Sequence, residues 1–461
     1  MKSRMPRVFI SAAHKSSGKT TLTLGLCAAF DARGHAVQPF KKGPDYIDPL
    51  WLGMAAQRPC YNLDFHMMRR DEIERQFARA AAGARISLIE GNKGLYDGLD
   101  LDGGNSNAAL AKLLDAPVVL VIDARGMTRG VAPLILGYQA FDPDIRIAGV
   151  ILNNLGGSRH ESKLRAVIEH YTDVEVIGAV QHDPAMQIAE RHLGLVPANE
   201  QQAAQASIQQ VGNRVAAQVN LDRLLAIADS ASDRSVPTMP DGTISSAERV
   251  RIGIAHDQVF GFYYSEDLDT LRASNVDLIQ LDTLHASALP QVDGLIIGGG
   301  FPEMFMTPLE ANASLRASIR SAIESGLPTY AECGGLMYLS RTLAWKGQTC
   351  EMVGVVPGDT VMHERPVGRG YARLQPTGDD RWQEADSIPA HEFHYSSLEN
   401  LPAGSIFAYE VKRGQGIDGL HDGYQLHNLL AGYVHRRGTG QQGWITPFLK
   451  QVRAHKARAA V

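Results

Sequence analysis

Short apolar runs alternate with helix-like patterns along this chain, and the alternation occurs twice. The first series of runs lies at 7–12, 86–89, 118–122, 147–152 and 174–180, and the second lies at 251–255, 277–281, 294–297 and 327–331. Strands that alternate with helices predict parallel sheets covered by helices on both faces. The predicted fold class is therefore α/β, with one sheet in each half of the chain.

Residues 230–246 separate the two series. This stretch is polar, contains two prolines and a glycine, and has no sustained periodicity, which is typical of a linker. A chain of 461 residues is also longer than one hydrophobic core usually supports. We therefore predict a first domain at 1–229, a linker at 230–248, a second domain at 249–449 and a basic C-terminal tail at 450–461.

Charge and cysteine content restrict the partners and the compartment. The formal net charge of −5 gives no reason to expect nucleic acid or an anionic membrane as a partner. No run reaches the length of about 18 apolar residues expected of a membrane span. Four cysteines without regular spacing, after an N-terminus that lacks a signal-peptide pattern, favour the reducing cytoplasm. The sequence leaves open whether the protein forms a homodimer.

A phosphate-binding loop follows the first predicted strand. The segment Ala13-His-Lys-Ser-Ser-Gly-Lys-Thr20 differs from the strict motif because Ala13 replaces its first glycine. Gly18 would let backbone N–H groups approach phosphate oxygens, Lys19 would reach the β- and γ-phosphates, and Thr20 would bind Mg²⁺. These residues and Thr21 are the expected nucleotide-binding set, with ATP and Mg²⁺ as cofactors.

Carboxylates near the ends of predicted strands are candidate metal or substrate groups. Glu90 ends the apolar run 86–89, where an acid holds Mg²⁺ in P-loop enzymes. The loop 41–49 contains two acids and two lysines between glycine and proline, and a solvated turn is its alternative interpretation. Asp97 follows in the glycine-rich segment 91–98. The carboxyl ends of parallel strands face the ligand crevice, which favours a functional role.

A cysteine lies at a predicted strand-to-helix turn in the second domain. Cys333 stands between small residues, after a short apolar run and before a helical pattern. This arrangement is typical of a nucleophile elbow, which holds a thiol near backbone N–H groups at a helix start. Gly299 and Gly300 end another apolar run, and with Gly334 they are candidate oxyanion donors. A plain strand-ending loop is the alternative.

A thiolate nucleophile needs a base, and spacing alone does not choose one. The histidines that follow the cysteine include His363, His391, His394, His421, His427 and His435. We prefer His435, because it follows a strand-like run near the end of the domain. Cys27 lies in an apolar helical pattern and is expected in the core, whereas Cys60 and Cys350 have no partner motif.

A thiol nucleophile and an ATP site in one chain favour glutamine-dependent amidation. A ParA-like P-loop switch ATPase with a non-catalytic second domain would explain the phosphate loop but not Cys333. A binding protein with an inactive amidotransferase domain would lack the nucleophile, which is present here. Dethiobiotin synthetase would need only the first half of the chain.

Six segments resemble those of the cobyrinic acid a,c-diamide synthases, in the same order and over nearly the whole chain. They are Lys42-Gly-Pro-Asp-Tyr-Ile-Asp-Pro49, Arg58-Pro-Cys-Tyr-Asn-Leu-Asp64, Gly94-Leu-Tyr-Asp-Gly98, Glu190-Arg-His-Leu-Gly-Leu-Val-Pro197, Tyr330-Ala-Glu-Cys-Gly-Gly-Leu-Met337 and His391-Glu-Phe-His-Tyr-Ser396. The resemblance implies a dethiobiotin-synthetase-like P-loop domain and a class-I-like glutamine amidotransferase domain. Cys333 would be the glutaminase nucleophile and His435 its base. This group generally lacks the usual third acid, and Arg437 occupies that position here.

The resemblance also implies a reaction and an acceptor site. Acetate carboxylates of a tetrapyrrole would be amidated through an acyl phosphate, with ammonia taken from glutamine. Mg²⁺ would be held by Thr20, Asp45 and Glu90. The acceptor site would consist of Tyr46, Asp48, Lys93, Tyr96 and Asp97.

One departure from the family pattern leaves the substrate open. Members that act on cobyrinic acid commonly read Glu-Gly-Val-Met-Gly-Leu-Tyr-Asp-Gly, whereas this chain reads Glu90-Gly-Asn-Lys-Gly-Leu-Tyr-Asp-Gly98. The form with Asn92 and Lys93 resembles the siroheme amide synthases of dissimilatory sulfur metabolism. Lys93 could pair with a tetrapyrrole carboxylate, and a neutral surface exchange is the alternative. Cobyrinic acid, hydrogenobyrinic acid and siroheme remain candidate acceptors.

Overall fold

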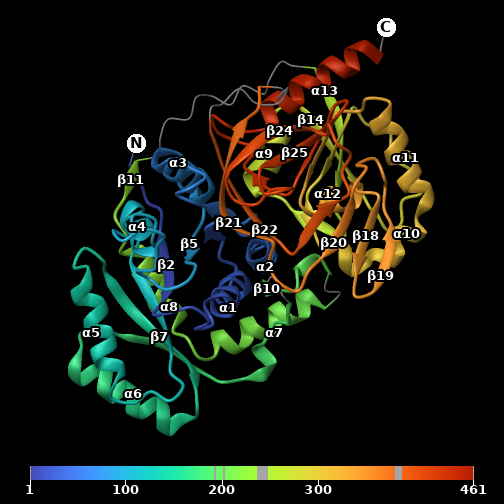
Figure 1. Cartoon of the computed structure of the whole chain (residues 1–461). Helices are drawn as coiled ribbons and strands as arrows, with labels where there is room; N and C mark the ends of the chain where they lie inside the picture. The colour runs from blue at the N-terminus through green and yellow to red at the C-terminus, as the bar shows by residue number, and fades with distance from the viewer. Residues whose placement is uncertain (1, 192–193, 201–202, 236–247, 379–386, 460–461) are drawn as a thin grey trace. The chain divides into compact units, whose positions relative to one another are not determined.

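The computed structural model describes residues 2–191, 194–200, 203–235, 248–378 and 387–459. It divides into two compact units, Met1–Thr238 and Met239–Val461 (Figure 1). The division falls within the predicted linker 230–248, of which residues 236–247 lie outside the described residues. The predicted domain limits remain a prediction, whereas the α/β fold class is confirmed by the sheets and helices of both units.

A seven-stranded parallel sheet forms the centre of the first unit, in the order β4-β3-β5-β2-β6-β7-β8. Its strands are β2 (Arg7–Ala12), β3 (Val37–Lys42), β4 (Tyr61–Leu63), β5 (Ile86–Glu90), β6 (Val118–Asp123), β7 (Ile147–Leu155) and β8 (Val176–Gln181). Every residue of β2, β3 and β5 is buried, as expected of strands covered on both faces. The loops after β2, β3 and β5 therefore lie together at one edge of the sheet.

Helices connect and cover these strands. They are α1 (Lys19–Ala32), α2 (Ile47–Ala56), α3 (Arg70–Ala81), α4 (Asn107–Leu113), α5 (Val131–Phe141), α6 (Ser158–Tyr171), α7 (Ala204–Ala216) and α8 (Leu221–Asp229). Short pieces complete the unit: β1 (Lys2–Ser3) paired with β11 (Arg234–Ser235), β9 (Glu190–Arg191) paired with β10 (Gly194–Leu195), and 3₁₀ turns at Pro184–Met186 and Ala198–Glu200. An extended apolar core joins the sheet to α3, α4, α5 and α6.

The second unit contains a ten-stranded mixed sheet in the order β14-β12-β15-β17-β26-β25-β24-β21-β22-β27. The parallel part consists of β12 (Val250–Ala255), β14 (Val276–Leu281), β15 (Gly294–Ile297), β17 (Thr329–Glu332) and β26 (Leu429–Gly432). The antiparallel part consists of β21 (Gly368–Pro376), β22 (Ile388–His394), β24 (Ile406–Arg413), β25 (His421–Leu426) and β27 (His435–Arg436). The alternation in the sequence predicted β12, β14, β15 and β17 of the parallel part, and it did not predict the antiparallel extension.

The remaining elements of the second unit surround that sheet. A smaller sheet contains β18 (Thr342–Trp345), β19 (Gln348–Glu351), β20 (Asp359–Met362) and β23 (Ser396–Glu399), and β13 (Phe260–Phe262) pairs with β16 (Gly299–Gly300). The helices are α9 (Ser265–Ala273), the 3₁₀ turn Pro302–Phe305, α10 (Met306–Ala311), α11 (Ala313–Glu324), α12 (Gly334–Leu339) and α13 (Ile445–Ala459). None of the helices that the structure describes is long and apolar enough to cross a lipid bilayer.

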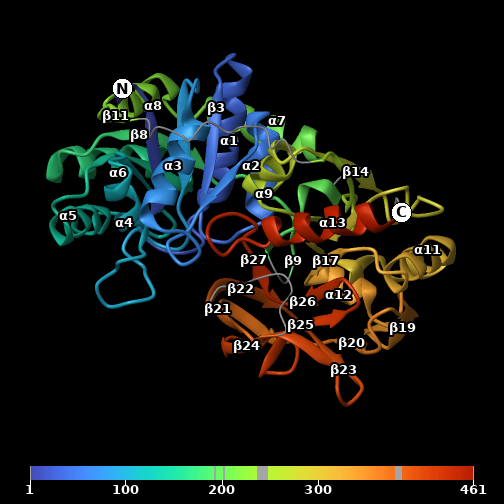
Figure 2. The same cartoon turned by 90° about the horizontal axis from the view of Figure 1, so that it is seen from above.

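The segment 450–461, predicted to be a basic tail, continues helix α13 as far as Ala459 (Figure 2, red). Phe448, Leu449 and Val452 of this helix are buried in an apolar cluster with strands β12 and β17. That apolar face, which alternates with the basic residues, is why the segment packs as a helix instead of extending as a tail.

Candidate active sites

The loop between β2 and α1 has the geometry of a phosphate-binding turn. Gly18 precedes α1 with a φ of 83°, a left-handed conformation that favours glycine. Steric crowding also requires glycine here, because a Cβ at this position would lie 2.2 Å from Nδ2 of Asn153. Asn153 also donates a hydrogen bond of 2.9 Å to the Ser17 carbonyl and so fixes the turn. Within the described residues no side chain caps α1, which leaves its first N–H groups for an anion.

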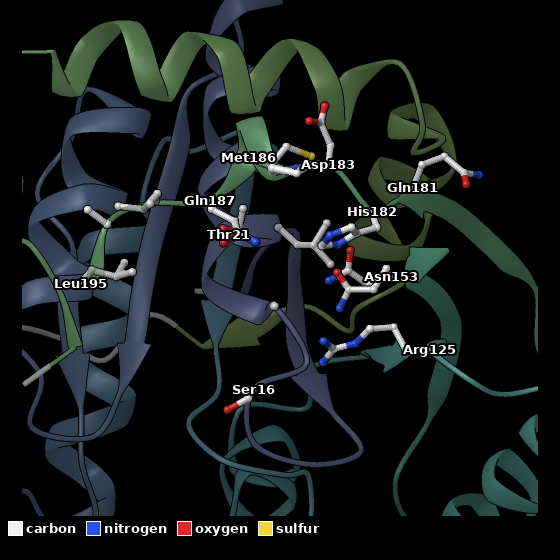
Figure 3. Close-up of a pocket in the computed structure, with 16 residues that line it drawn as sticks. Ser16, Thr21, Arg125, Asn153, Gln181, His182, Asp183, Met186, Gln187 and Leu195 are labelled. Carbon is white, nitrogen blue, oxygen red and sulfur yellow. The ribbon is translucent and has the colours of Figure 1, made fainter. Parts of the chain in front are cut away.

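A cavity of about 780 Å³ adjoins this turn (Figure 3). Gly18 and Thr21 line one side of it, Asn153 and Asn154 of β7 line another, and Gln181 at the end of β8 lies in the wall with residues 182–184 and 186–189. The volume is in the range of small-molecule sites. The sequence pattern predicted Gly18 and Thr21 as nucleotide-binding residues but did not identify the other walls. The signal was available, because Asn153 and Asn154 lie near the carboxyl end of a predicted strand, where α/β sheets bind ligands.

Beside the turn, the buried Lys41 contacts three carboxylates. Its Nζ donates to Asp48 Oδ2 at 2.5 Å and to Glu90 Oε1 at 2.8 Å, and it lies 4.0 Å from Asp45 Oδ2. The Thr20 hydroxyl donates to the same Glu90 oxygen at 2.7 Å. The structure thus brings Thr20, Asp45 and Glu90 together, with Asp48, around a lysine to which sequence reasoning gave no role.

Burial and mutual repulsion determine the protonation of this cluster. Burial lowers the pKa of Lys41, but Asp48, Glu90 and Asp45 raise it well above its usual value. Burial raises the pKa of Asp45 to about 7, Asp48 adds to that shift, and burial also raises the pKa of Glu90. Burial lowers the pKa of the P-loop Lys19 to about 8, although Glu90 opposes that change. The carboxyl pKa values are raised chiefly because these groups are buried, and the neighbouring carboxylate of Asp48 adds to the effect.

The donor set suits Mg²⁺ bound together with phosphate oxygens. Oε2 of Glu90 is buried and has no hydrogen-bond partner in the described part of the chain, so it is available as a ligand beside the Thr20 hydroxyl. The same part of the chain contains no group of three or more His, Cys, Asp or Glu side chains arranged to hold a metal by themselves. Mg²⁺ usually needs only one or two protein carboxylates, because waters and substrate phosphates complete its octahedron. The residues therefore fit the ion.

The residues expected at the acceptor site are only partly brought together. Lys93, Tyr96 and Asp97 share the loop after β5, and both Lys93 and Asp97 are exposed. The Tyr96 hydroxyl, however, donates to the Tyr138 carbonyl at 2.6 Å. Asp97 accepts the Gly94 N–H at 2.8 Å.

The two other residues of that set lie near the start of α2. Asp48 belongs to the Lys41 cluster. Tyr46 is buried, with 8% of its surface exposed, and directly precedes α2. The expected set of five is therefore divided between the metal cluster, the start of α2 and the loop after β5.

In the second unit, Cys333 forms the turn between β17 and α12. Its backbone has φ 48° and ψ −104°, a strained conformation for a residue other than glycine and typical of a nucleophile elbow. The Cys333 N–H donates to the Gly432 carbonyl of β26 at 2.8 Å, which anchors the turn on the sheet. The side chain is 7% exposed.

The His435 ring contacts both this cysteine and Glu332. The His435 ring is hydrogen-bonded to the Cys333 side chain, and its Nδ1 lies 3.2 Å from Glu332 Oε2. The Arg436 N–H, at 2.9 Å, and the Tyr330 hydroxyl both donate to the other Glu332 oxygen. Burial lowers the pKa of His435, but Cys333 and Glu332 raise it to about 10. The ring is therefore held between a thiol and a carboxylate.

Sequence reasoning found the cysteine and the histidine but missed the acid. It expected no third acid after His435, and Arg437 at that position instead pairs with Glu266 at 3.0 Å. Glu332 comes from β17, directly before Cys333. A charged residue at the end of an otherwise apolar strand was the signal that could have identified it.

The other candidate histidines have different surroundings. His391 faces His435 across the β22–β27 pair and stacks on it, with ring centroids 5.0 Å apart. His363 contacts Ser397, His394 contacts Glu392, and His421 contacts Asp418, whereas His427 lies in the turn between β25 and β26. His435 is the candidate for which a contact with the Cys333 side chain is seen.

The glycines proposed as oxyanion donors surround the elbow. A Cβ on Gly334 would lie 2.9 Å from the backbone N of Gly300, and a Cβ on Gly299 would lie 2.8 Å from Cε1 of His435. Only glycine fits at these positions without displacement of the turn or the base. Cys27, Cys60 and Cys350 are buried and form no disulfide.

Comparisons with known proteins match both units. The family of CobQ/CobB/MinD/ParA nucleotide binding domains matches residues 9–196, and that of CobB/CobQ-like glutamine amidotransferase domains matches residues 251–440. The cobyrinate a,c-diamide synthase of Magnetococcus marinus is 48% identical over 97% of this chain and 97% of its own length. That of Methanosarcina acetivorans is 43% identical over 94% of this chain and 93% of its own. A solved glutamine amidotransferase covers 45% of this chain and 95% of its own, at 17% identity and a TM-score of 0.30.

Proposed function

The chain belongs to the cobyrinate a,c-diamide synthase family of glutamine-dependent amidating ligases, and on that basis we propose that it uses ATP, Mg²⁺ and glutamine to amidate acetate carboxylates of a tetrapyrrole. The observation that carries this proposal is the presence in one chain of a phosphate-binding turn beside an acid cluster and of a cysteine hydrogen-bonded to a histidine. The first arrangement suits carboxylate activation, and the second suits release of ammonia.

Activation is required because a carboxylate would have to expel oxide to accept ammonia. In the proposed sequence, a carboxylate oxygen of the acceptor attacks the γ-phosphorus of ATP, giving an acyl phosphate and ADP. Ammonia then attacks the acyl carbon, and phosphate leaves with the bonding electrons. Lys19 would neutralise charge on the transferring phosphoryl group. Mg²⁺ would add to that neutralisation when held by Thr20, Glu90 and Asp45.

Ammonia would come from glutamine in the second unit. The Cys333 thiolate attacks the amide carbon, and His435 passes the proton taken from the thiol to the departing ammonia. Water then hydrolyses the resulting thioester and releases glutamate. Glu332 would keep the His435 ring oriented and charged, as the acid of a triad does. Backbone N–H groups of Gly299, Gly300 and Gly334 are the proposed donors to the oxyanion.

The identity of the tetrapyrrole is part of the proposal. Cobyrinate is the first choice, because relatives that match this chain over nearly its whole length have that name. Siroheme is the second candidate, favoured by Asn92 and Lys93, which replace an apolar pair in the loop after β5. Hydrogenobyrinic acid would present the same acetate groups. The resemblance to ParA-type nucleotide-binding domains covers only residues 9–196, so it leaves Cys333 without a role.

Mass spectrometry of candidate tetrapyrroles tests this function. Each acceptor is incubated with the enzyme, ATP, Mg²⁺ and glutamine, and conversion of a carboxylate to an amide lowers the mass by about one unit because OH is replaced by NH₂. Two such changes on cobyrinate would support the diamide reaction, and changes on siroheme alone would select the alternative. Absence of any mass change on all three acceptors would refute the proposal.

Two further parts of the proposal concern the setting of the enzyme. We propose a cytoplasmic location, in keeping with four buried cysteines that form no disulfide. A homodimer is also proposed as the assembly, and analytical ultracentrifugation would decide it.

A further inference from the structure

Lys42 is a buried lysine that forms no ion pair within the described residues, although the charge of the buried Asp64 acts on it. It is the last residue of β3, is 5% exposed, and donates one hydrogen bond, of 3.2 Å, to the side-chain oxygen of Asn92. Within the described ranges no acid lies close enough to form an ion pair with it. Its neighbour Lys41, by contrast, contacts the carboxylates of Asp48 and Glu90.

A buried lysine of this kind destabilises the fold unless a ligand pairs with its charge and accepts its remaining hydrogen bonds. Removing an ammonium group from water is strongly unfavourable, and one neutral amide oxygen offsets only part of that cost. Burial lowers the pKa of Lys42 to about 8, Asp64 opposes the change, and Lys93 adds to it. An ammonium group has three N–H donors, of which Asn92 accepts one. The remaining donors are suited to an anion.

The side chain of Asn92 is held firmly beside this lysine. A Cβ on Gly43 would lie 3.1 Å from the Asn92 Nδ2, so the amide packs directly on the backbone that follows Lys42. The Asn92 carbonyl accepts a hydrogen bond from the side chain of Asn107, which also donates to the Gly94 carbonyl at 2.8 Å. The loop after β5 is therefore fixed from both sides, and it aims one amide oxygen at the buried ammonium.

The position of Lys42 separates it from the phosphate site. Successive residues of a strand point to opposite faces of the sheet. Lys41 points toward Thr20 and Glu90, where phosphate and Mg²⁺ are proposed to bind, and Lys42 contacts the loop that contains Lys93. Both lysines lie at the carboxyl end of β3, the ligand-facing edge of the sheet. Two cations on adjacent positions can therefore serve two different anions.

We propose that Lys42, held by Asn92 and assisted by Lys93, binds a carboxylate of the acceptor other than the one that is being amidated. This inference rests on the proposed function, because a tetrapyrrole presents several carboxylates at fixed separations. An ion pair to a second carboxylate fixes the rotation of the macrocycle, and the rotation determines which acetate faces the phosphoryl donor. Lys42 is thus assigned as a residue that determines substrate specificity.

Direct binding measurements test the assignment. Acceptor affinity is measured by absorbance titration with cobyrinic acid and with siroheme, on the wild type and on Lys42→Met, Asn92→Val and Asn92→Val/Lys93→Met. Losing a charge-assisted hydrogen bond should weaken acceptor binding roughly 10- to 100-fold in Lys42→Met, with smaller losses in Asn92→Val. The exposed Lys112, which pairs with Asp142, provides the matched control Lys112→Met, whose affinity should not change.

Two additional measurements distinguish a ligand site from a structural role or a phosphate site. Lys42→Met should unfold at the same temperature as the wild type or higher, because it removes a buried charge without a partner. Its affinity for a fluorescent ATP analogue and its glutaminase rate should equal those of the wild type. For the methyl ester of the same tetrapyrrole, wild type and Lys42→Met should bind equally, because the ester has no carboxylate to pair.

The outcomes separate this inference from the function on which it rests. Equal acceptor affinity of wild type and Lys42→Met, a lower unfolding temperature, or weaker ATP binding would each overturn the assignment of Lys42 while amidation remains. A wild-type enzyme that neither binds nor amidates a tetrapyrrole would instead overturn the proposed function, and the Lys42 site with it.

Discussion

The turn after β2 and the turn after β17 are built alike and used differently. Each connects a buried parallel strand to a helix through a residue of positive φ, Gly18 at 83° and Cys333 at 48°, and neither helix has a side-chain cap in the described structure. In the first turn the residue of positive φ has no side chain, so a ligand can approach the backbone. In the second turn the residue of positive φ carries the thiol that is proposed to react.

The two turns also differ in how completely the buried charges around them are paired. Around the first turn, Glu90 keeps a buried oxygen without a hydrogen-bond partner, and Lys42 keeps a buried ammonium without an ion pair, within the part of the chain that is described. Around the second turn, Cys333, His435 and Glu332 satisfy one another. The first site is electrostatically incomplete without its ligands, whereas the second is assembled in advance. Substitutions at the second turn should therefore affect only amidation with glutamine as the nitrogen donor. Substitutions at the first turn should affect amidation with either donor.

The largest expected effect is that of Cys333→Ser on glutamine-dependent amidation. Removing the nucleophile of a triad-type site typically costs on the order of 10³-fold or more. Amidation with ammonium salts as the donor should stay near the wild-type rate, because the first unit retains all its groups. Rates with both donors are compared by mass spectrometry, with the buried Cys350→Ser as the matched control. Equal loss of rate with both donors would contradict the assignment of ammonia release to the second turn and of carboxylate activation to the first.

Lys19→Ala or Glu90→Ala should remove amidation with either donor, because both residues act before nitrogen arrives. The loss of one charge-stabilising group in phosphoryl transfer should cost on the order of 10²-fold or more. Glutamine hydrolysis measured separately should continue, and Lys112→Ala on the surface serves as control. Ammonia-dependent turnover that survives in either variant would show that the ATP site lies elsewhere.

Glu332→Gln should lower the glutaminase rate roughly 10- to 100-fold, by analogy with partners that orient reactive groups. Glu332 helps to raise the pKa of His435 to about 10, so its neutral replacement lowers that pKa. Because the imidazolium form then deprotonates at a lower pH, the alkaline limb of the glutaminase pH profile should move to lower pH. Ammonia-dependent amidation is the internal control. An unshifted profile would contradict the orienting role.

Tyr96→Phe should have the smallest effect. Its hydroxyl donates to the Tyr138 carbonyl, and the loss of one hydrogen bond typically costs about 1 kcal/mol of unfolding free energy. Affinity for the tetrapyrrole should not change, since the hydroxyl is directed at the backbone. Denaturant unfolding and absorbance titration provide the two measurements. Weaker acceptor binding at unchanged stability would restore the substrate contact expected from the sequence.

The sequence predicted elements whose pattern is local. The runs 7–12, 118–122 and 294–297 lie within β2, β6 and β15, because continuous apolar residues identify a strand buried on both faces. Strand β3 escaped notice because it ends in two lysines, and the burial of Lys41 depends in part on Glu90, which lies far along the chain. The antiparallel strands from β21 to β25 escaped notice because their buried and exposed residues mix without a strict alternation.

The same division applies to the candidate sites. Spacing alone identified the candidate residues that belong to a short sequence motif, because a turn between a strand and a helix involves only adjacent residues. These residues are Gly18, Lys19, Thr20 and Cys333. His435 was preferred among six histidines, and the contact with Cys333, 102 positions earlier, comes from the pairing of β27 with β22 and of β17 with β26.

What the sequence by itself determined is therefore the fold class and the two reactive turns, because strand, turn and helix are properties of neighbouring residues. Only the tertiary structure decided how the charges are matched. It joined Lys41 to Glu90 and left Lys42 with Asn92 as its partner, and it placed Glu332 against His435. Those pairings depend on the order of strands in a sheet, and that order is determined by packing of the whole core instead of by any local run of residues.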